Sequence, residues 1–400
     1  MEQQLLIGDE RIAETVPVPF RGNSKLVNIL FVIDQLCETG GAERCLLNTI
    51  RLLPKDRFRP SLATFKIDRS GLFNELPCPL HLFPLRRTYD WNGLRTAWKI
   101  RQLIKQQDID IVQTFFETSD LWTGPIAKLS GTALISSRRD MGILRHPKHQ
   151  LAYRAVAPLF DTVLTVSEQV RNFCIQQDRL DPRKVTTIYN GIELSRIEAA
   201  RPDEKLKAAL GLFDASHLIV TVGHIRKVKN IDGFLETAFR VCKEFPRAAF
   251  LIVGDVTEPE YFRQLQILTS SLGLDKNVRF MGASENVLAI LKLCDVFCLL
   301  SHSEGFSNAL VEAMACSLPC VATRVGGNAE AMDNGVSGLL VDVKDSEAAA
   351  EKILWLLRYP DLARRMGQAG RRIVELNFSA EAMVQRLVGI YESVLARTHA

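Results

Sequence analysis

The chain has 400 residues, 47% of them hydrophobic, and its 50 Lys and Arg nearly balance its 46 Asp and Glu. This length predicts two or three domains, each able to bury a core. The balanced charge argues against a nucleic-acid-binding protein, which would need a strongly basic surface, so no nucleic-acid partner is expected.

The nine cysteines and seven histidines follow no pattern typical of a metal site or a disulfide framework. No C-x-x-C pair occurs, and the pairs that lie four apart, Cys294/Cys298 and Cys316/Cys320, fall within apolar runs. We therefore expect reduced thiols, as in a cytosolic protein, and neither a metal ion nor another cofactor.

No segment predicts a membrane span or a signal peptide. The longest apolar stretch, residues 287–300, is interrupted by Lys292 and Asp295 and is shorter than a bilayer requires. The start of the chain has neither a positive segment nor a long apolar core. We expect a cytoplasmic protein that could still contact the inner face of the membrane peripherally.

In chain order, residues 1–25 predict an irregular N-terminal extension, because Pro17, Pro19 and Gly22 interrupt any regular pattern. Two series of short apolar runs, separated by helical patterns, then follow. The first series predicts strands at residues 27–33, 109–113, 134–136, 162–166 and 185–188. The second predicts strands at residues 218–222, 249–253, 278–280, 296–300, 319–322 and 338–341.

Continuous Val, Ile and Leu runs between helices are typical of parallel sheets buried on both faces. Two successive series therefore predict an α/β protein with two doubly wound, Rossmann-like domains facing each other across a cleft. A turn at Asn190–Gly191 precedes a charged, Ala-rich segment, so we place an N-terminal domain at residues 26–191 and a C-terminal domain at residues 192–378.

The last segment, residues 379–400, predicts a helix with one apolar face, formed by Met383, Leu387, Ile390 and Val394. No strand follows it, and we expect it to pack back on the N-terminal domain. Ligands of open parallel sheets bind beyond the carboxyl ends of the strands, so the loops directly after the strands are the candidate sites.

The loop after the first strand contains Gly40 and Gly41, followed by Ala42 and Glu43. A glycine pair that opens a helix lets backbone N–H groups approach an oxyanion, although an ordinary turn would have the same composition. It is not a dinucleotide fingerprint, because no G-x-G-x-x-G follows any strand. This disfavours a dinucleotide oxidoreductase.

The strand at 218–222 is followed by Gly223, His224 and a loop with three cations. Arg226 and Lys229 are three residues apart, so a turn can bring both to one diphosphate. A solvated charged loop remains the alternative. Glycine or polar residues also follow the other strands of this series, among them Gly254, Met281–Gly282, Gly326–Gly327 and Glu330.

The most informative segment, residues 303–315, holds two carboxylates, Glu304 and Glu312, eight residues apart. Ser307 or Asn308 can cap a helix that runs to about Cys316, with Glu304 on the preceding loop and Glu312 in the second turn. The N–H groups of the first turn can then bind an anion between them. A glutamate near a helix start also simply favours the helix dipole, so the segment alone does not settle its function.

Together these motifs resemble the retaining glycosyltransferases of family four, which have the two-domain GT-B fold. The resemblance covers about residues 27–391 and is carried by the following motifs: Gly40–Gly41–Ala42–Glu43, Asn190–Gly191, Gly223 through Lys229, Glu304–Gly305–Phe306 with Glu312–Ala313–Met314–Ala315, and Gly326–Gly327 with Glu330. It implies a nucleotide-sugar donor bound mainly by the second domain and an acceptor bound mainly by the first.

The resemblance also implies residue roles. Arg226 and Lys229 match the cations on the donor diphosphate, Glu304 matches the carboxylate on the transferred sugar, and these three are the candidate catalytic residues. Glu312 matches the carboxylate on the ribose. The other donor-binding candidates are Gly40, Gly41, Gly223, Gly254, Met281, Gly305, Phe306, Ser307 and Asn308.

Two positions depart from the family pattern. His224 stands where many members have Arg, and Arg226 then carries that cation two residues later. The segment 113–117 lacks the His that many members place near the C6 hydroxyl of the sugar, which suggests a different sugar or a substitute. Phe115, Arg138 and Arg139 are the candidate acceptor or sugar contacts.

The expected function is retaining transfer of a hexose-type sugar from a nucleoside-diphosphate sugar, with UDP favoured, to a glycan or lipid-linked acceptor in polysaccharide or glycolipid synthesis. Two alternatives stay open: a non-catalytic sugar-nucleotide-binding partner of an assembly complex, and a nucleotide-sugar 2-epimerase. The basic segment 138–154 could meet an anionic membrane or a pyrophosphate-linked lipid. In the basic segment 86–105, the helical spacing of Leu94, Ala97, Trp98 and Ile104 favours core packing.

Overall fold

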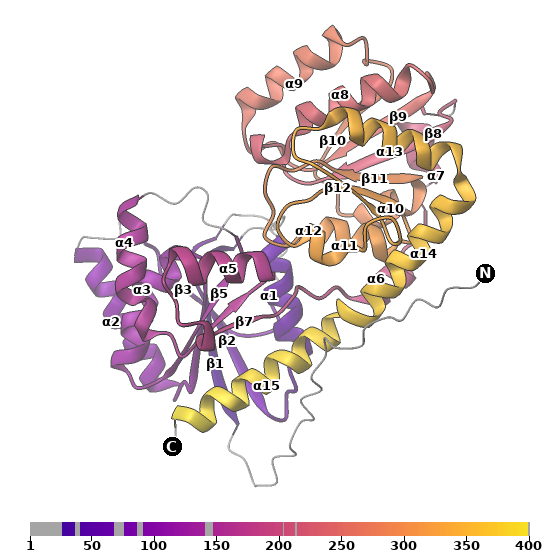
Figure 1. Ribbon diagram of the computed structural model, residues 1–400. Helices are drawn as coiled ribbons and strands as arrows, with labels where there is room; N and C mark the ends of the chain where they lie inside the picture. Colours follow the sequence, from indigo (N-terminus) through magenta and orange to yellow (C-terminus); the bar gives the residue numbers. More distant parts are fainter. Residues whose placement is uncertain are drawn as a thin grey trace.

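The computed structural model describes residues 26–36, 41–67, 76–85, 91–140, 147–202, 204–212 and 214–398. These residues form two lobes, each built on one parallel sheet covered by helices (Figure 1). The first sheet has seven strands in the order β3-β2-β1-β4-β5-β6-β7, and the second has six in the order β10-β9-β8-β11-β12-β13. The predicted pair of doubly wound α/β units is therefore confirmed.

The first lobe alternates strands and helices from Val27 to Thr187. It contains β1 (Val27–Leu36), α1 (Gly41–Leu52), β2 (Phe58–Ile67), β3 (Leu80–Leu82), α2 (Trp91–Gln106), β4 (Ile111–Phe115), α3 (Glu117–Leu129), β5 (Ala133–Arg138), α4 (Pro147–Val156), η2 (Ala157–Leu159), β6 (Thr162–Thr165), α5 (Glu168–Gln177), η3 (Pro182–Lys184) and β7 (Val185–Thr187). The strand order reverses between β1 and β4, so the loops after these two strands open at a crevice.

The second lobe repeats the plan. It contains α6 (Leu194–Ala199), α7 (Glu204–Ala209), β8 (His217–Val222), η4 (Lys227–Lys229), α8 (Ile231–Cys242), β9 (Ala248–Val253), α9 (Pro259–Ser271), β10 (Val278–Gly282), α10 (Val287–Leu293), β11 (Val296–Leu299), α11 (Asn308–Ala315), β12 (Cys320–Thr323), α12 (Asn328–Ala331), β13 (Leu339–Val341), α13 (Ser346–Arg358) and α14 (Pro360–Asn377). Here the order reverses between β8 and β11, which brings the loops after those strands together.

The chain crosses between the lobes twice, and the two crossings are hydrogen-bonded to each other. The Ile192 N–H donates to the Phe378 carbonyl at 2.9 Å, and the Ala380 N–H donates to the Ile192 carbonyl at 2.9 Å. The final helix, α15 (Ala380–Thr398), then runs back along the first lobe (Figure 1). Its Met383, Leu387 and Tyr391 are buried in the same cluster as the β1 side chains.

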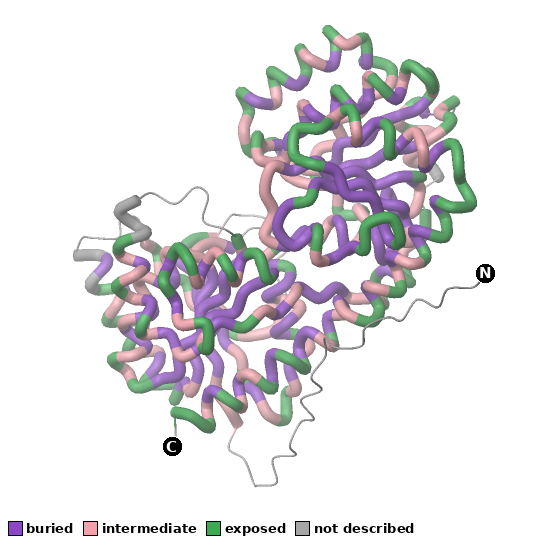
Figure 2. The backbone as a smooth tube through the Cα atoms, viewed as in Figure 1, coloured by how far each residue is buried: buried purple, intermediate pink, exposed green. Residues whose placement is uncertain are grey.

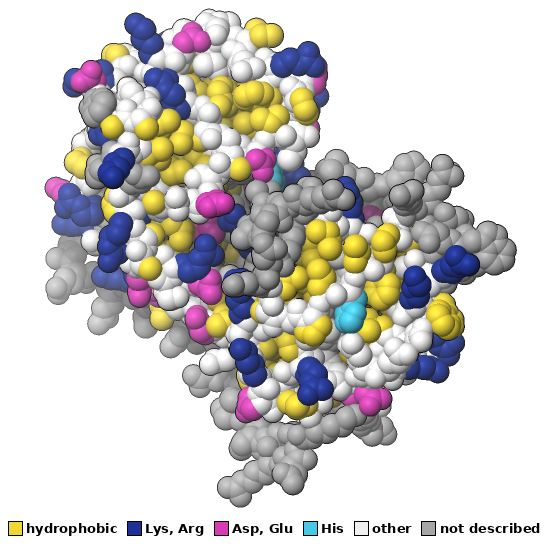
Figure 3. Space-filling view, turned by 180° about the vertical axis from the view of Figure 1, so that it is seen from behind, with side chains coloured by type: hydrophobic (Ala, Val, Ile, Leu, Met, Phe, Trp, Pro, Cys, Tyr) yellow, Lys and Arg dark blue, Asp and Glu magenta, His cyan; other side chains and the backbone are white. Residues whose placement is uncertain are grey.

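The central strands of both sheets are buried on both faces, and most exposed positions lie on the surrounding helices and loops (Figure 2). The β1 residues from Ile29 to Ile33 are fully buried, and all six positions of β9 are buried. This explains the continuous apolar runs, because helices cover each side of a parallel sheet. On the face seen in Figure 3, side chains of both charge signs are interspersed over both lobes, as the balanced composition implies.

Each predicted strand overlaps a strand of the structure, but β2 and β3 were missed. Arg59 and Pro60 interrupt the apolar run of β2, and β3 has only three residues. The prediction that Trp98 packs in the core is wrong, because its side chain is 64% exposed on α2. None of the helices in the described ranges combines the length and the apolar character needed to cross a bilayer.

A candidate active site between the lobes

A cleft of about 1780 Å³ lies between the two lobes. The first lobe contributes the start of α1 and the segments that follow β4 and β5. The second lobe contributes the segments that follow β8, β9 and β11, together with the start of α11. These are carboxyl ends of parallel strands, where the sequence placed the candidate loops.

Lys229 and Glu304 form an ion pair on the second-lobe side of this cleft. The Lys229 Nζ lies 2.6 Å from Glu304 Oε1, and the two side chains are 13% and 10% exposed. The Ser301 hydroxyl also donates to Glu304 Oε1 at 2.6 Å. The pair joins the loop after β8 to the loop after β11, and the reversal of strand order between these neighbours makes the contact possible.

Backbone contacts hold these two loops in place. Asn230 adopts a left-handed conformation (φ 52°) and caps α8 by accepting from the Gly233 N–H. Its amide nitrogen donates to the Leu300 carbonyl at 2.9 Å, and the His302 N–H donates to the Val228 carbonyl at 2.8 Å. Lys229 is therefore presented by a rigid turn.

Arg226, three residues earlier, also lines the cleft. It is half-buried, and within the described part of the chain its Nε has no hydrogen-bond partner and its guanidinium has no carboxylate partner. Burial, and then Arg226 itself, lower the pKa of the neighbouring His224. The loop therefore offers a cation whose charge is not neutralised by the protein, which suits an oxyanion ligand.

The helix prediction for residues 307–316 is confirmed: α11 spans Asn308–Ala315, and the Ser307 hydroxyl accepts from the Leu310 N–H. The earlier N–H groups of the first turn have no partner inside the helix. Ser307, Asn308 and Glu312 all line the cleft. Burial raises the pKa of the Glu312 carboxyl, although the nearby Arg44 and Arg196 act in the opposite direction.

Gly223 and Gly254, two of the predicted donor-binding residues, are in close contact with each other. Gly223 (φ 158°) and Gly254 (φ 151°) both line the cleft, and a Cβ on Gly254 would lie 2.1 Å from the Gly223 carbonyl oxygen. A side chain at Gly254 would therefore force β9 away from the cation loop. Met281, by contrast, lies on β10 and packs against the core, and the segment after it, from Ala283 to Asn286, lines the cleft instead.

The first lobe reaches the start of α11 through Gly41, the first residue of α1. The Asn308 side chain donates to the Gly41 carbonyl at 3.1 Å and accepts from the Asn190 amide at 2.8 Å. Gly40 lies outside the described residues. The lobes are thus joined by direct polar contacts at the N-terminal end of α11.

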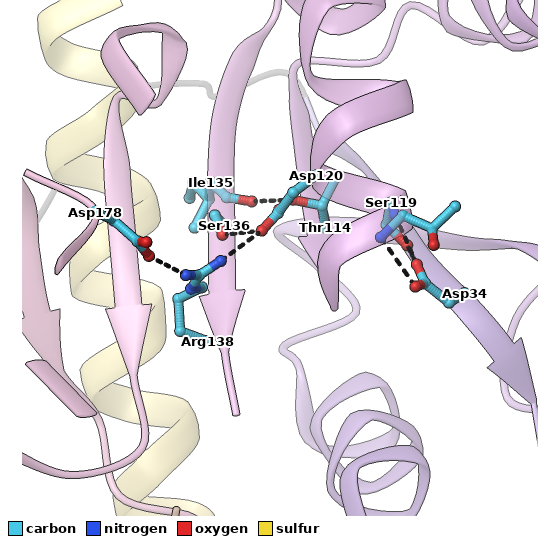
Figure 4. A network of polar contacts seen from close by, with 9 residues as sticks. Asp34, Thr114, Ser119, Asp120, Ile135, Ser136, Arg138 and Asp178 are labelled. Carbon is cyan, nitrogen blue, oxygen red and sulfur yellow. Dashed lines mark hydrogen bonds and ion pairs between the residues drawn. The ribbon is translucent and has the colours of Figure 1, made fainter. Parts of the chain in front are cut away.

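Arg138 borders the cleft, but its guanidinium is held in a buried network of carboxylates (Figure 4). Its guanidinium is paired with Asp178 and, at 3.6 Å, with Asp120, and it lies 3.9 Å from the centre of the Tyr153 ring. Asp120 also accepts from the Thr114 and Ser136 hydroxyls. Only 5% of the Arg138 side chain is exposed, and its ion pairs are with carboxylates inside the lobe.

A second carboxylate of the first lobe anchors the start of α3. Asp34 accepts from the Thr118 N–H at 3.0 Å and from the Ser119 N–H at 2.6 Å (Figure 4). Burial raises the pKa of Asp34, and it raises the pKa of Asp120 to about 7 in spite of Arg138. Asp34 thus joins the end of β1 to α3 at the edge of the cleft, and Asp120 joins α3 to β4 and β5.

The neighbouring Arg139 points into the cleft. Its Nη1 donates to the Asn190 side-chain oxygen at 2.6 Å, its guanidinium lies 5.4 Å from the centre of the Phe115 ring, and its buried Nε has no partner among the described residues. Phe115 itself is 3% exposed, within the core of the lobe. The two adjacent arginines therefore have different environments, which their spacing in the sequence did not indicate.

The structure adds Phe116, which sequence reasoning missed. Phe116 lines the cleft at the end of β4 with φ 70° and ψ 173°, a region that residues other than glycine rarely adopt. No sequence signal could have identified it, because the strain arises from how β4 joins α3.

Comparisons with known proteins agree with this architecture. A family model described as Glycosyltransferase Family 4 matches residues 39–196, and one described as Glycosyl transferases group 1 matches residues 202–373, so together they span most of the chain. A glycosyltransferase from Rickettsia africae superimposes with a TM-score of 0.81 at 22% identity, over 93% of this chain and 99% of that one. Anabaena HepE in complex with UDP and glucose gives 0.79 at 22% identity, over 92% and 100%.

Among curated relatives, N-acetyl-alpha-D-glucosaminyl L-malate synthase from Bacillus anthracis is 34% identical over 59% of this chain and 60% of its own length. D-inositol 3-phosphate glycosyltransferase from Thermobifida fusca is 28% identical over 72% of this chain and 70% of its own length. The fold is the GT-B fold, and the chain belongs to the group 1 glycosyltransferases of the family 4 type.

Proposed function

We propose that this protein is a retaining glycosyltransferase that uses a nucleoside-diphosphate sugar, with UDP as the favoured nucleotide. The observation that carries the proposal is the combination of the unpaired Arg226, the Lys229–Glu304 pair and the start of α11 in one cleft. Two cations and a helix N-terminus provide a site for a diphosphate, and Glu304 provides an acceptor for sugar hydroxyls. The complex of Anabaena HepE with UDP and glucose supports this choice of donor.

In this proposal the charges act on the leaving group. Breaking the anomeric bond puts negative charge on the diphosphate, which Arg226, Lys229 and the first turn of α11 stabilise. When the donor binds, its phosphate replaces Glu304 as the ion-pair partner of Lys229. The Glu304 carboxylate can then accept hydrogen bonds from the sugar hydroxyls. The acceptor hydroxyl attacks from the face that the phosphate leaves, and a phosphate oxygen takes its proton, so no protein nucleophile is needed.

The test is the thermal shift produced by UDP, GDP and ADP and their common sugars, without added metal. We expect one nucleotide to raise Tm, and we expect Arg226→Ala and Lys229→Ala to abolish the shift. Lys227→Ala is the matched control, because it removes an exposed lysine from the same turn. No shift with any nucleotide would contradict the donor assignment.

A second arm of the same test separates the alternatives. Donor consumption that requires no acceptor would favour a 2-epimerase. Nucleotide binding without turnover, over a broad set of hydroxyl acceptors, would favour a non-catalytic binding partner. Transfer with retained anomeric configuration, read from the coupling constant of the anomeric proton in the product, would support the proposal.

For the acceptor, we propose a hydroxyl compound that also carries an acid group, with Arg139 as its contact on the first lobe. The names of three relatives, the third from Escherichia coli, include L-malate, D-inositol 3-phosphate and alpha-D-GlcNAc-diphosphoundecaprenol, and each of these compounds carries an acid group. Arg139 has a buried Nε without a described partner. Turnover by Arg139→Ala that equals the wild type with every acidic acceptor would count against this assignment.

We also propose peripheral contact with an anionic membrane, on its inner face, through α2 and α4. Helix α2 carries exposed Arg95, Lys99, Arg101 and Lys105 with no acidic residue, beside the exposed Trp98. Leu151 on α4 is 72% exposed, and both helices pack on α3. Flotation with vesicles that contain anionic lipid should be lost at high salt and weakened in Trp98→Ser, whereas salt-independent or absent binding would refute this contact.

A further inference from the structure

The segment from Gly326 to Glu330 is packed directly on the loop that carries Glu304. The Gly327 N–H donates to the Gly305 carbonyl at 2.9 Å. Gly326 has φ 50°, and a Cβ on it would lie 1.6 Å from the Glu304 carbonyl oxygen, while one on Gly327 would lie 2.4 Å from the Phe306 ring. Only glycine fits this close approach, so the two loops must move together.

Glu330 extends from this segment to the opposite lobe. Its Oε2 accepts from the Glu168 N–H at 2.8 Å, and its Oε1 accepts from the Gln169 N–H at 3.0 Å. These are the first two residues of α5, which belongs to the first lobe. The next N–H, that of Val170, is satisfied within the lobe by the Ser167 hydroxyl. Two of the N–H groups that a helix start leaves open are therefore satisfied from across the cleft.

Tyr189 joins this contact from the first lobe. Its phenol lies near the Glu330 carboxylate, and burial, followed by that carboxylate, raises the pKa of the phenol. The Tyr189 ring lies 5.4 Å from the ring of Phe306, two residues after Glu304 in the chain. The Glu330 carboxylate is thus held by two backbone donors of the other lobe, beside the Tyr189 phenol.

The loop of Glu304 touches the first lobe at a second point. A Cβ on Gly305 would lie 2.1 Å from the Arg139 carbonyl oxygen and 3.3 Å from the Val166 side chain. The Glu304–Phe306 segment is therefore enclosed between the first lobe on one side and the Gly326–Gly327 segment on the other. The position of Glu304 then depends on how closely the lobes approach each other.

We propose that Glu330 is a positioning residue that holds the lobes closed and thereby keeps the Glu304 loop in place for the transferred sugar. The inference rests on the proposed function for its substrate. Arg226 and Lys229 belong to the second lobe alone, so donor binding needs little from Glu330. Sugar transfer to an acceptor on the first lobe needs the closed arrangement, because small displacements of reacting groups lower rates steeply.

The experiment compares Glu330→Ala and Glu330→Gln with Glu168→Ala. Glu168→Ala is the matched control because it removes an exposed side chain at the start of α5 and leaves the backbone N–H that Glu330 caps. Glu330→Gln guards against misfolding because it keeps the size of the side chain and one carbonyl oxygen. Four quantities are measured: amide hydrogen exchange at residues 168 and 169, the radius of gyration in solution, the Kd for UDP, and kcat.

For Glu330→Ala we expect exchange at the two amides to rise by about tenfold or more and the radius of gyration to increase. We expect kcat to fall by about tenfold or more while the Kd for UDP stays within about threefold. The values for Glu330→Gln should lie between those of Glu330→Ala and the wild type, because its single amide oxygen replaces the two carboxylate oxygens that accept from the α5 N–H groups. The values for Glu168→Ala should match those of the wild type.

Two outcomes would overturn the inference. Unchanged exchange in Glu330→Ala would mean that the contact does not form in solution. Faster exchange with an unchanged radius of gyration, and with kcat equal to the Glu168→Ala control, would mean that Glu330 only caps a helix. If the wild type neither binds nor turns over any nucleotide sugar, the proposed function fails, and the exchange and scattering measurements still decide the closing contact independently.

Discussion

The two halves of the cleft differ in how freely their charged groups face it. On the second lobe, Arg226 has no carboxylate partner among the described residues, and Lys229 forms its ion pair with Glu304 at the cleft wall. On the first lobe, Arg138 is buried between Asp120 and Asp178. This difference fits the proposal that the second lobe binds the charged donor, whereas the charge of Arg138 stabilises the first lobe itself.

The largest effect that tests this difference is expected for Arg138→Ala. The substitution leaves Asp120 and Asp178 buried without their cation, and breaking a buried ion pair in this way typically costs about 3–5 kcal/mol of the free energy of unfolding. Urea unfolding measures the loss. Arg139→Ala is the matched control next to it, and an equal loss in both variants would mean that the two arginines share one environment.

The next largest effect concerns catalysis on the second lobe. Arg226→Ala or Lys229→Ala should lower kcat by about 100-fold or more, because each removes a charge that stabilises the leaving diphosphate. The free energy of unfolding should change little in Arg226→Ala, because the Arg226 Nε has no hydrogen-bond partner and the guanidinium no ion-pair partner among the described residues. Steady-state kinetics with the donor found by thermal shift provides the measurement, and near-normal turnover in both variants would remove the diphosphate assignment.

A smaller effect is expected from the strained backbone of Phe116. Phe116→Gly and Phe116→Ala both remove the ring, but only glycine relieves the positive φ of 70°. The glycine variant should therefore be the more stable of the two by about 1 kcal/mol, the reverse of the usual order of these residues. Thermal or urea unfolding of the pair tests it, and greater stability of the alanine variant would show that the position is not strained.

The smallest expected effect is a dependence of stability on pH that originates in the first lobe. Burial raises the pKa of Asp120 to about 7 from 3.8, so the folded state binds this proton more tightly than the unfolded state. Its contribution to the free energy of unfolding should fall as pH rises from about 4 to 7. Asp120→Asn should flatten that slope in urea unfolding measured across this range, and an unchanged slope would point to Asp34 as the source.

Much of the second lobe's side of the cleft could be predicted from the sequence, because short-range sequence features produce it. Ser307 caps α11 whatever the distant chain does, and a glycine followed by cations after β8 is visible as a pattern. The missed strand β2 shows the limit of that approach, since its pairing with β1 and β3 compensates for the break at Arg59 and Pro60.

The first lobe's half depended on contacts between residues far apart in the chain. Arg138 and Arg139 are neighbours, yet one meets Asp120 and Asp178 inside the lobe and the other meets Asn190 at the cleft. Phe115 and Phe116 differ in the same way, because one packs in the core and the other lines the cleft with a positive φ. No local pattern distinguishes the members of such pairs.

The sequence by itself determined the two sheets, the helix α11 and its cap, and the set of cations and carboxylates at the strand ends, because hydrophobic period, capping and turn residues act over a few positions. Only the tertiary structure decided which charges stay unpaired, where the backbone is strained, and that Glu330 caps a helix of the opposite lobe. Those properties depend on long-range packing, in which residues 162 positions apart become hydrogen-bond partners.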